Sequence, residues 1–75
     1  MEFSEKLKKA LDEKDYELAH KLLSSEIERL LKDESLLSLR WLYSDIINTE
    51  EDINISLYRL MHLYEKITKK ESDNH

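Results

Sequence analysis

No glycine and no proline occur among the 75 residues of this chain. Phosphate-binding loops, tight hairpin turns and the strained turns that carry catalytic serines depend on these residues for their backbone geometry. The sequence therefore argues against Rossmann and P-loop nucleotide-binding folds and against hydrolases that present a nucleophile on such a turn. Cysteine is also missing, which excludes disulfides, thiolate metal sites and cysteine nucleophiles.

Apolar residues recur three and four positions apart along the whole chain, which is the spacing that places them on one side of an α-helix. No segment alternates polar and apolar residues in the manner of a strand. The pattern predicts an all-α fold of four helices, arranged as two antiparallel helical hairpins. We expect a single helical domain over residues 1–70 and a flexible C-terminal tail over residues 71–75.

Helix-capping residues mark the expected boundaries, which give helices over about residues 3–13, 16–32, 36–47 and 50–70. Asp15 precedes the second helix, where its carboxylate can accept hydrogen bonds from the first free amides. Either Asp33 or Ser35 can cap the third helix. Asn48 and Thr49 are expected to cap the fourth helix, whose first turn then contains the acids at positions 50–52.

The two halves of the chain match at an offset of 34 residues, which pairs Phe3 with Leu37 and Leu23 with Leu57. Helix pairs that repeat with this period are typical of stacked helical-repeat proteins. The repeat predicts that each half forms one hairpin.

The first interhelical turn carries a resemblance to a known family. Asp15 and Tyr16, followed by the small Ala19, resemble the turn and second helix of a tetratricopeptide repeat, over about a third of the chain. That family has a glycine where this chain has Lys14, and the second half has Ile53 at the small position. The resemblance implies binding to another protein rather than catalysis, and a generic four-helix bundle or a dimeric helical hairpin is the alternative.

The expected third helix is apolar on two sides. Its main face comprises Leu36, Leu39, Leu42, Tyr43, Ile46 and Ile47. Leu37 and Trp41, one turn apart, form a second stripe, and a helix that is apolar on two sides must be covered on both. Either neighbouring helices bury both faces, or Leu37 and Trp41 form a dimer or partner interface. Tyr43 and Tyr58 would then add contact area.

Four acidic residues surround the last interhelical connection: Asp45, Glu50, Glu51 and Asp52. Acids at the start of a helix ordinarily complement the helix dipole. The alternative is an acidic surface that docks on a basic protein, as an inhibitor of a nucleic-acid-binding protein would.

The overall charge restricts the partners further. With 17 acidic and 12 basic residues the net charge is −5, which disfavours direct binding to nucleic acid or to an anionic membrane. No apolar run approaches the roughly 18 residues that a membrane span requires. The start of the chain lacks the basic-then-apolar pattern of a secretion signal, so we expect a cytoplasmic location.

Catalytic and metal-binding patterns are weak. Glu17 and His20 have the spacing of the ligand pair in di-iron helical bundles, but a second such pair and two facing glutamates are needed. The chain offers only the reversed pair His62 and Glu65. We expect no enzyme activity, no metal and no cofactor, with a metal-binding bundle as the least favoured alternative.

The sequence thus predicts a protein–protein interaction module that acts as a small regulatory or scaffolding subunit. Its expected partners are another protein and a second copy of itself in a homodimer. The candidate partner-binding residues are Leu37, Trp41, Tyr43 and Tyr58.

Overall fold

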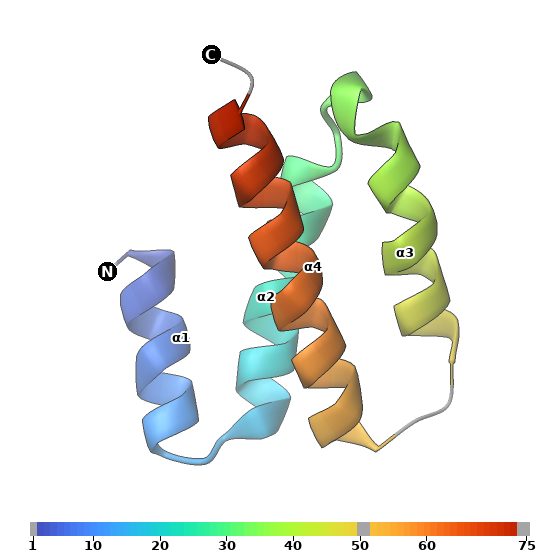
Figure 1. Ribbon diagram of the computed structural model, residues 1–75. Coiled ribbons are helices and arrows are strands. Elements are labelled where there is room, and N and C mark those ends of the chain that lie inside the picture. Colours follow the sequence, from blue (N-terminus) through green and yellow to red (C-terminus); the bar gives the residue numbers. More distant parts are fainter. Residues whose placement is uncertain (1, 50–51, 74–75) are drawn as a thin grey trace.

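The computed structural model describes residues 2–49 and 52–73, with side chains considered through residue 69. Within these residues the chain forms four α-helices and one short 3₁₀ helix, η1, and contains no strand (Figure 1). The elements are α1 (Phe3–Asp12), α2 (Tyr16–Leu30), η1 (Glu34–Leu36), α3 (Leu37–Asn48) and α4 (Ile53–Asp73). The predicted all-α fold is confirmed.

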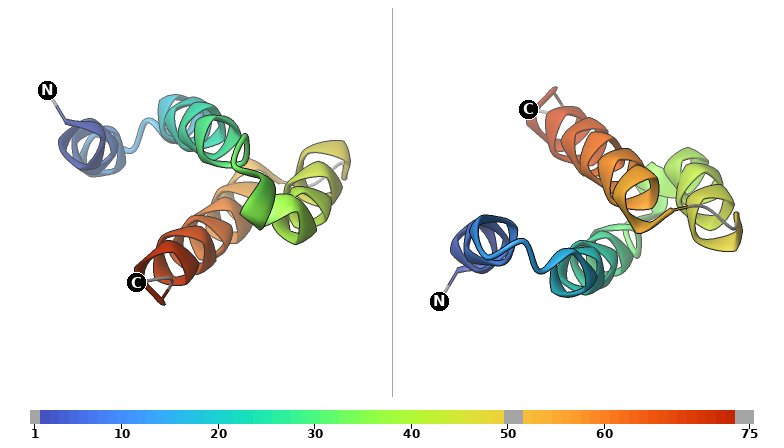
Figure 2. Two further views of the ribbon diagram at one scale, coloured as in Figure 1. Left: turned by 90° about the horizontal axis from the view of Figure 1, so that it is seen from above. Right: turned by 90° about the horizontal axis from the view of Figure 1, so that it is seen from below.

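The helices form two antiparallel pairs, α1 with α2 and α3 with α4, and α4 packs on α2 (Figures 1 and 2). In the end-on views α1 and α3 lie at opposite outer sides of the central α2 and α4. The molecule measures 35 × 30 × 16 Å. Because α1 and α3 lie at the outer sides, each keeps a face that no other helix covers.

The core lies mainly between α2 and α4. Its fully buried large side chains are Leu23 and Ile27 of α2, Leu36 of η1, and Leu60 and Ile67 of α4. Burying a side chain of this size stabilises the fold by about 1.5–3 kcal/mol. The apolar stripes that helical spacing predicts for the second and fourth helices therefore supply most of the core.

One polar contact crosses the interface between α2 and α4. Ser56 of α4 is buried, and its hydroxyl lies 2.9 Å from Nε2 of His20 on α2. An unsatisfied buried hydroxyl would weaken the packing. The hydrogen bond with His20 therefore makes Ser56 compatible with the core and places His20 in a structural contact.

Aspartates cap the first turns of three elements. The Asp15 carboxylate accepts from the Leu18 amide at 3.2 Å, which confirms the predicted cap of α2. Asp33 caps η1, accepting from the backbone amide and the hydroxyl of Ser35 at 3.0 and 2.9 Å. These two hydrogen bonds, the one from the amide foremost, lower the pKa of Asp33.

The predicted cap at Asn48 and Thr49 is wrong, because both residues complete α3 instead. The Asn48 amide donates to the Ser44 hydroxyl at 3.1 Å, and the Thr49 hydroxyl donates to the Asp45 carbonyl at 2.6 Å. Asp52 takes the capping role for α4, since its carboxylate accepts from the Asn54 amide at 2.8 Å.

The longest element is α4, with 21 residues. It continues to Asp73 and so includes three residues of the segment 71–75, for which the sequence predicts a flexible tail. None of the described helices combines the length and the apolar character that crossing a bilayer demands.

Lys14 adopts a left-handed backbone conformation, with φ of 59°. Its amide donates to the Leu11 carbonyl at 3.0 Å and the Asp15 amide donates to the Ala10 carbonyl at 2.8 Å. These bonds form a Schellman motif, in which glycine is the usual left-handed residue. A residue with a Cβ atom is strained in this conformation by about 1–2 kcal/mol.

We expect Lys14→Gly to raise the free energy of unfolding by about 1 kcal/mol, because relief of the strain exceeds the added flexibility of the unfolded chain. Urea denaturation followed by far-ultraviolet circular dichroism measures this change. Lys14→Ala is the matched control, since it removes the charged side chain but keeps the Cβ atom. Equal stabilities of the two variants would contradict the assignment of strain to this turn.

Candidate partner-binding surfaces

Leu37 and Trp41 lie on the outer face of α3. Their side chains are 53% and 81% exposed, respectively. Neither α2 nor α4 covers this second apolar stripe, so in the isolated chain it is surface and not core. The two residues border a shallow depression together with Arg40 and Ser44.

The orientation of α3 explains this exposure. Leu39, Tyr43 and Ile46 pack against the core. Successive residues of a helix are rotated by about 100°, so Trp41 lies about 140° around the helix from Ile46. With its inner face packed on α4, α3 therefore directs the stripe of Leu37 and Trp41 away from the molecule.

Arg40 joins the start of α3 to the end of α2. Its Nε donates to the Leu31 carbonyl at 2.6 Å. The last carbonyls of a helix have no partner within the helix, and a cation there also complements the helix dipole. Arg40 therefore adds a polar contact between α3 and the end of α2 to the apolar packing of the inner face of α3.

Tyr43 does not join Leu37 and Trp41. It is partly buried against the core, and its hydroxyl donates to the Glu28 carboxylate of α2 at 2.7 Å. Burial, followed by the hydrogen bond to Glu28 and the negative charge of that residue, raises the pKa of Tyr43 to about 12. The polar end of Tyr43 thus contacts α2 of the same chain.

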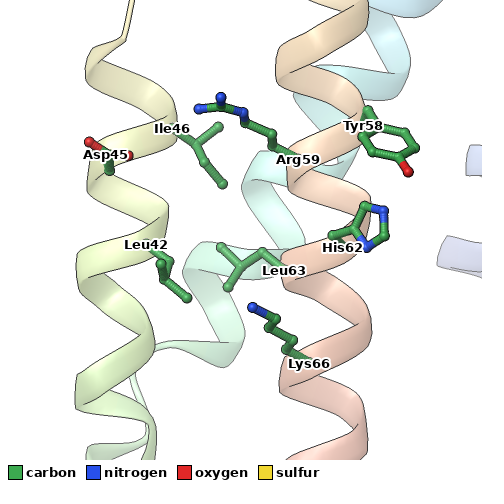
Figure 3. A pocket seen from close by; sticks show the side chains of 8 residues that line it. All are labelled: Leu42, Asp45, Ile46, Tyr58, Arg59, His62, Leu63 and Lys66. Carbon is green, nitrogen blue, oxygen red and sulfur yellow. The ribbon is translucent and has the colours of Figure 1, made fainter.

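Tyr58 lies on the outer face of α4, apart from Trp41. It is 65% exposed and packs edge-on against the His62 ring, with the ring centroids 4.4 Å apart. It adjoins a groove of about 240 Å³ between α3 and α4 (Figure 3). The residues that line this groove are Leu42, Asp45, Ile46, Tyr58, Arg59, His62, Leu63 and Lys66.

The groove was not predicted from the sequence. The apolar spacing of the third helix predicts that Leu42 belongs to its main face. In the structure Leu42 is 41% exposed, whereas Leu63 is buried. The sequence did contain a pattern that indicates one shared face, because Arg59, Leu63 and Lys66 are spaced four and three residues apart on α4.

The candidate acidic surface is described only in part. Asp45 is exposed and lies at the groove, whereas the Asp52 carboxylate caps α4. Glu50 and Glu51 lie outside the described residues. A shared surface of all four acids therefore stays a prediction.

Metal-ligand residues do not gather in the described part of the chain, where no group of three or more histidine, aspartate or glutamate side chains could hold an ion. His20 is hydrogen-bonded to Ser56, and His62 contacts Tyr58. His20 and His62 thus each have a role in packing.

We expect the free energy of unfolding to fall between about pH 10 and pH 12 through ionisation of Tyr43. Its pKa is raised to about 12 in the folded chain from an ordinary 10.0. The neutral phenol therefore contributes its full stability below pH 10, and this contribution is lost as the pH rises through the folded pKa. Urea unfolding at a series of pH values tests this, with Tyr43→Phe as the variant that cannot titrate. Parallel pH profiles of the two proteins over this range would show that the pKa of Tyr43 is not raised in the folded chain.

Comparisons with protein families, with curated proteins and with solved structures find no match to this chain. The resemblance to the tetratricopeptide repeat therefore rests on Asp15, Tyr16, Ala19 and the 34-residue offset alone.

Proposed function

We propose that this chain is a cytoplasmic protein-interaction module, a small regulatory or scaffolding subunit, that forms a homodimer through Leu37 and Trp41. The observation that carries the proposal is the 81% exposure of Trp41 on an apolar face. Tryptophan is enriched among the residues that dominate the binding energy of protein interfaces. Contiguous exposed apolar surface of this kind marks contact sites.

The arrangement of the helices supports this proposal. Because α3 lies at an outer side, its inner face contacts α4 while Leu37 and Trp41 face outward. A two-fold contact between α3 helices would cover the same patch in both copies. It would also give a small domain the additional burial that a thin fold lacks.

The charge of α3 favours an apolar contact. Arg40 and Asp45 are the only charged residues of this helix. Arg40 already donates to the Leu31 carbonyl, and Asp45 lies at the groove that faces α4. The proposed interface therefore depends little on ion pairs, and its affinity should change little with salt.

Sedimentation equilibrium at low and high salt tests this proposal. We expect a dimer at both, and Trp41→Ala should weaken dimerisation at least about tenfold, because truncating an aromatic anchor commonly costs about 2 kcal/mol or more. Circular dichroism should show unchanged helical content, since Trp41 makes little contact within its own chain.

The matched control is Leu18→Ala, which removes an exposed apolar side chain from α2, 43% exposed in the structure. It should leave the dissociation constant unchanged. A wild-type protein that stays monomeric at the highest concentration would refute self-association through this face. Steep weakening of the dimer by salt would instead show that ion pairs hold the interface and would refute the apolar contact.

A further inference from the structure

The groove between α3 and α4 opens on the side of this helix pair opposite to α2, which lies behind it in Figure 3. Leu42 and Ile46 of α3 and Leu63 of α4 form its apolar base. Two of these side chains are buried, whereas Leu42 is 41% exposed and accessible from the groove. The α3/α4 pair is thus covered by a helix on one side and open on the other.

Exposed apolar surface continues along α4. Tyr58 is 65% exposed and Ile55 is 50% exposed, on the outer face of the helix. Tyr58 packs edge-on against His62, which restrains its ring beside the groove. Such a ring offers a large contact area at little cost in conformational entropy.

The charges at the groove differ from those of the chain as a whole. Among the described residues, the charged side chains that line the groove are Arg59 and Lys66 of α4 and Asp45 of α3, although the chain carries a net charge of −5. The two cations are seven residues apart, which is about 10 Å or two helical turns. Arg59 has other interactions within the chain. Lys66 is exposed and is therefore the cation more accessible to a bound helix.

We infer that the groove binds an acidic amphipathic helix of a different protein. Two adjacent helices present a groove into which the apolar face of a third helix can pack, with anchors three and four positions apart. The anchors of the bound helix would contact Leu42, Ile46 and Leu63. Its carboxylates, spaced two turns apart, would lie against Arg59 and Lys66.

A second copy of this chain fits the groove less well. In a contact between two such grooves, the described lining of each copy supplies two cations and one acid, Asp45. The excess positive charge would disfavour the pairing. The inferred site is also separate from the Leu37 and Trp41 face, so the proposed dimer can form whether or not the groove is occupied.

Selection from a displayed library of amphipathic helices tests the inference. Every peptide carries leucines at i, i+3, i+4 and i+7. Each position that flanks this apolar face is Glu, Lys or Gln with equal probability. The full-length chain is the target. We expect Glu to be enriched at flanking positions seven apart, whereas a preference for Lys, no preference, or no binders would overturn the inference.

The selected peptides are then measured against three variants of the chain by fluorescence anisotropy. We expect Lys66→Glu to weaken binding about tenfold, by exchanging an attraction for a repulsion, and Leu42→Ala to weaken it through lost apolar contact. Trp41→Ala is the matched control and should leave the affinity unchanged. Lys66→Gln, which only removes the charge, should fall between wild type and Lys66→Glu.

Two outcomes separate this inference from the proposed function. Peptides whose binding is lost in Trp41→Ala but retained in Lys66→Glu would place the site on the outer face of α3 and overturn the groove assignment. If the Lys66→Glu variant self-associates more weakly than the wild-type protein in sedimentation equilibrium, a second copy occupies the groove. The inference of a helix from a different protein is then wrong. If only the Trp41→Ala variant loses the dimer, the result supports the proposed homodimer and leaves the inference about the groove unchanged.

Discussion

The buried contact between α2 and α4 holds the two hairpins together. Leu23 and Ile27 on one helix and Leu60 and Ile67 on the other are fully buried, and the hydrogen bond between His20 and Ser56 lies at the same interface. The remaining elements attach to this central pair. Phe3 of α1 contacts the Tyr64 ring of α4, with the ring centroids 5.4 Å apart. On the other side Arg40 binds the end of α2 and the inner face of α3 packs on the core.

This central pair also explains where binding surfaces can exist. Because α3 lies at an outer side of the molecule, its inner face packs on the core while its outer face is left uncovered. Its apolar residues therefore divide into a packed set, which includes Tyr43, and an exposed set, which includes Leu37 and Trp41. The proposed homodimer face and the inferred helix-binding groove both include apolar residues of α3 that stay uncovered, as is expected of a small domain that buries a modest share of its surface.

Helix caps and apolar stripes depend on residues close together in the chain and could be predicted from the sequence. Where several adjacent residues could cap the same helix, the sequence did not show which one does. Asp15 caps α2 as expected, because an aspartate directly before an apolar helical stripe has few alternatives. Asn48, Thr49 and Asp52 are all capable of capping the next helix. The structure uses Asp52, and the other two complete α3. Tyr43 and Trp41 likewise lie on one helix. The broader apolar face, which includes Tyr43, was recognisable from the sequence, but whether a neighbouring helix also covers the stripe of Trp41 was not.

The sequence by itself determined the all-α fold, the approximate helix boundaries and the apolar stripes, because helix formation and capping depend on residues at most a few positions apart. The tertiary structure decided that Leu37 and Trp41 are exposed, that Tyr43 contacts Glu28, and that Leu42 and Leu63 border one groove. These contacts join helices that are separated along the chain. They depend on the position and rotation of each helix relative to α2 and α4, which local spacing does not specify.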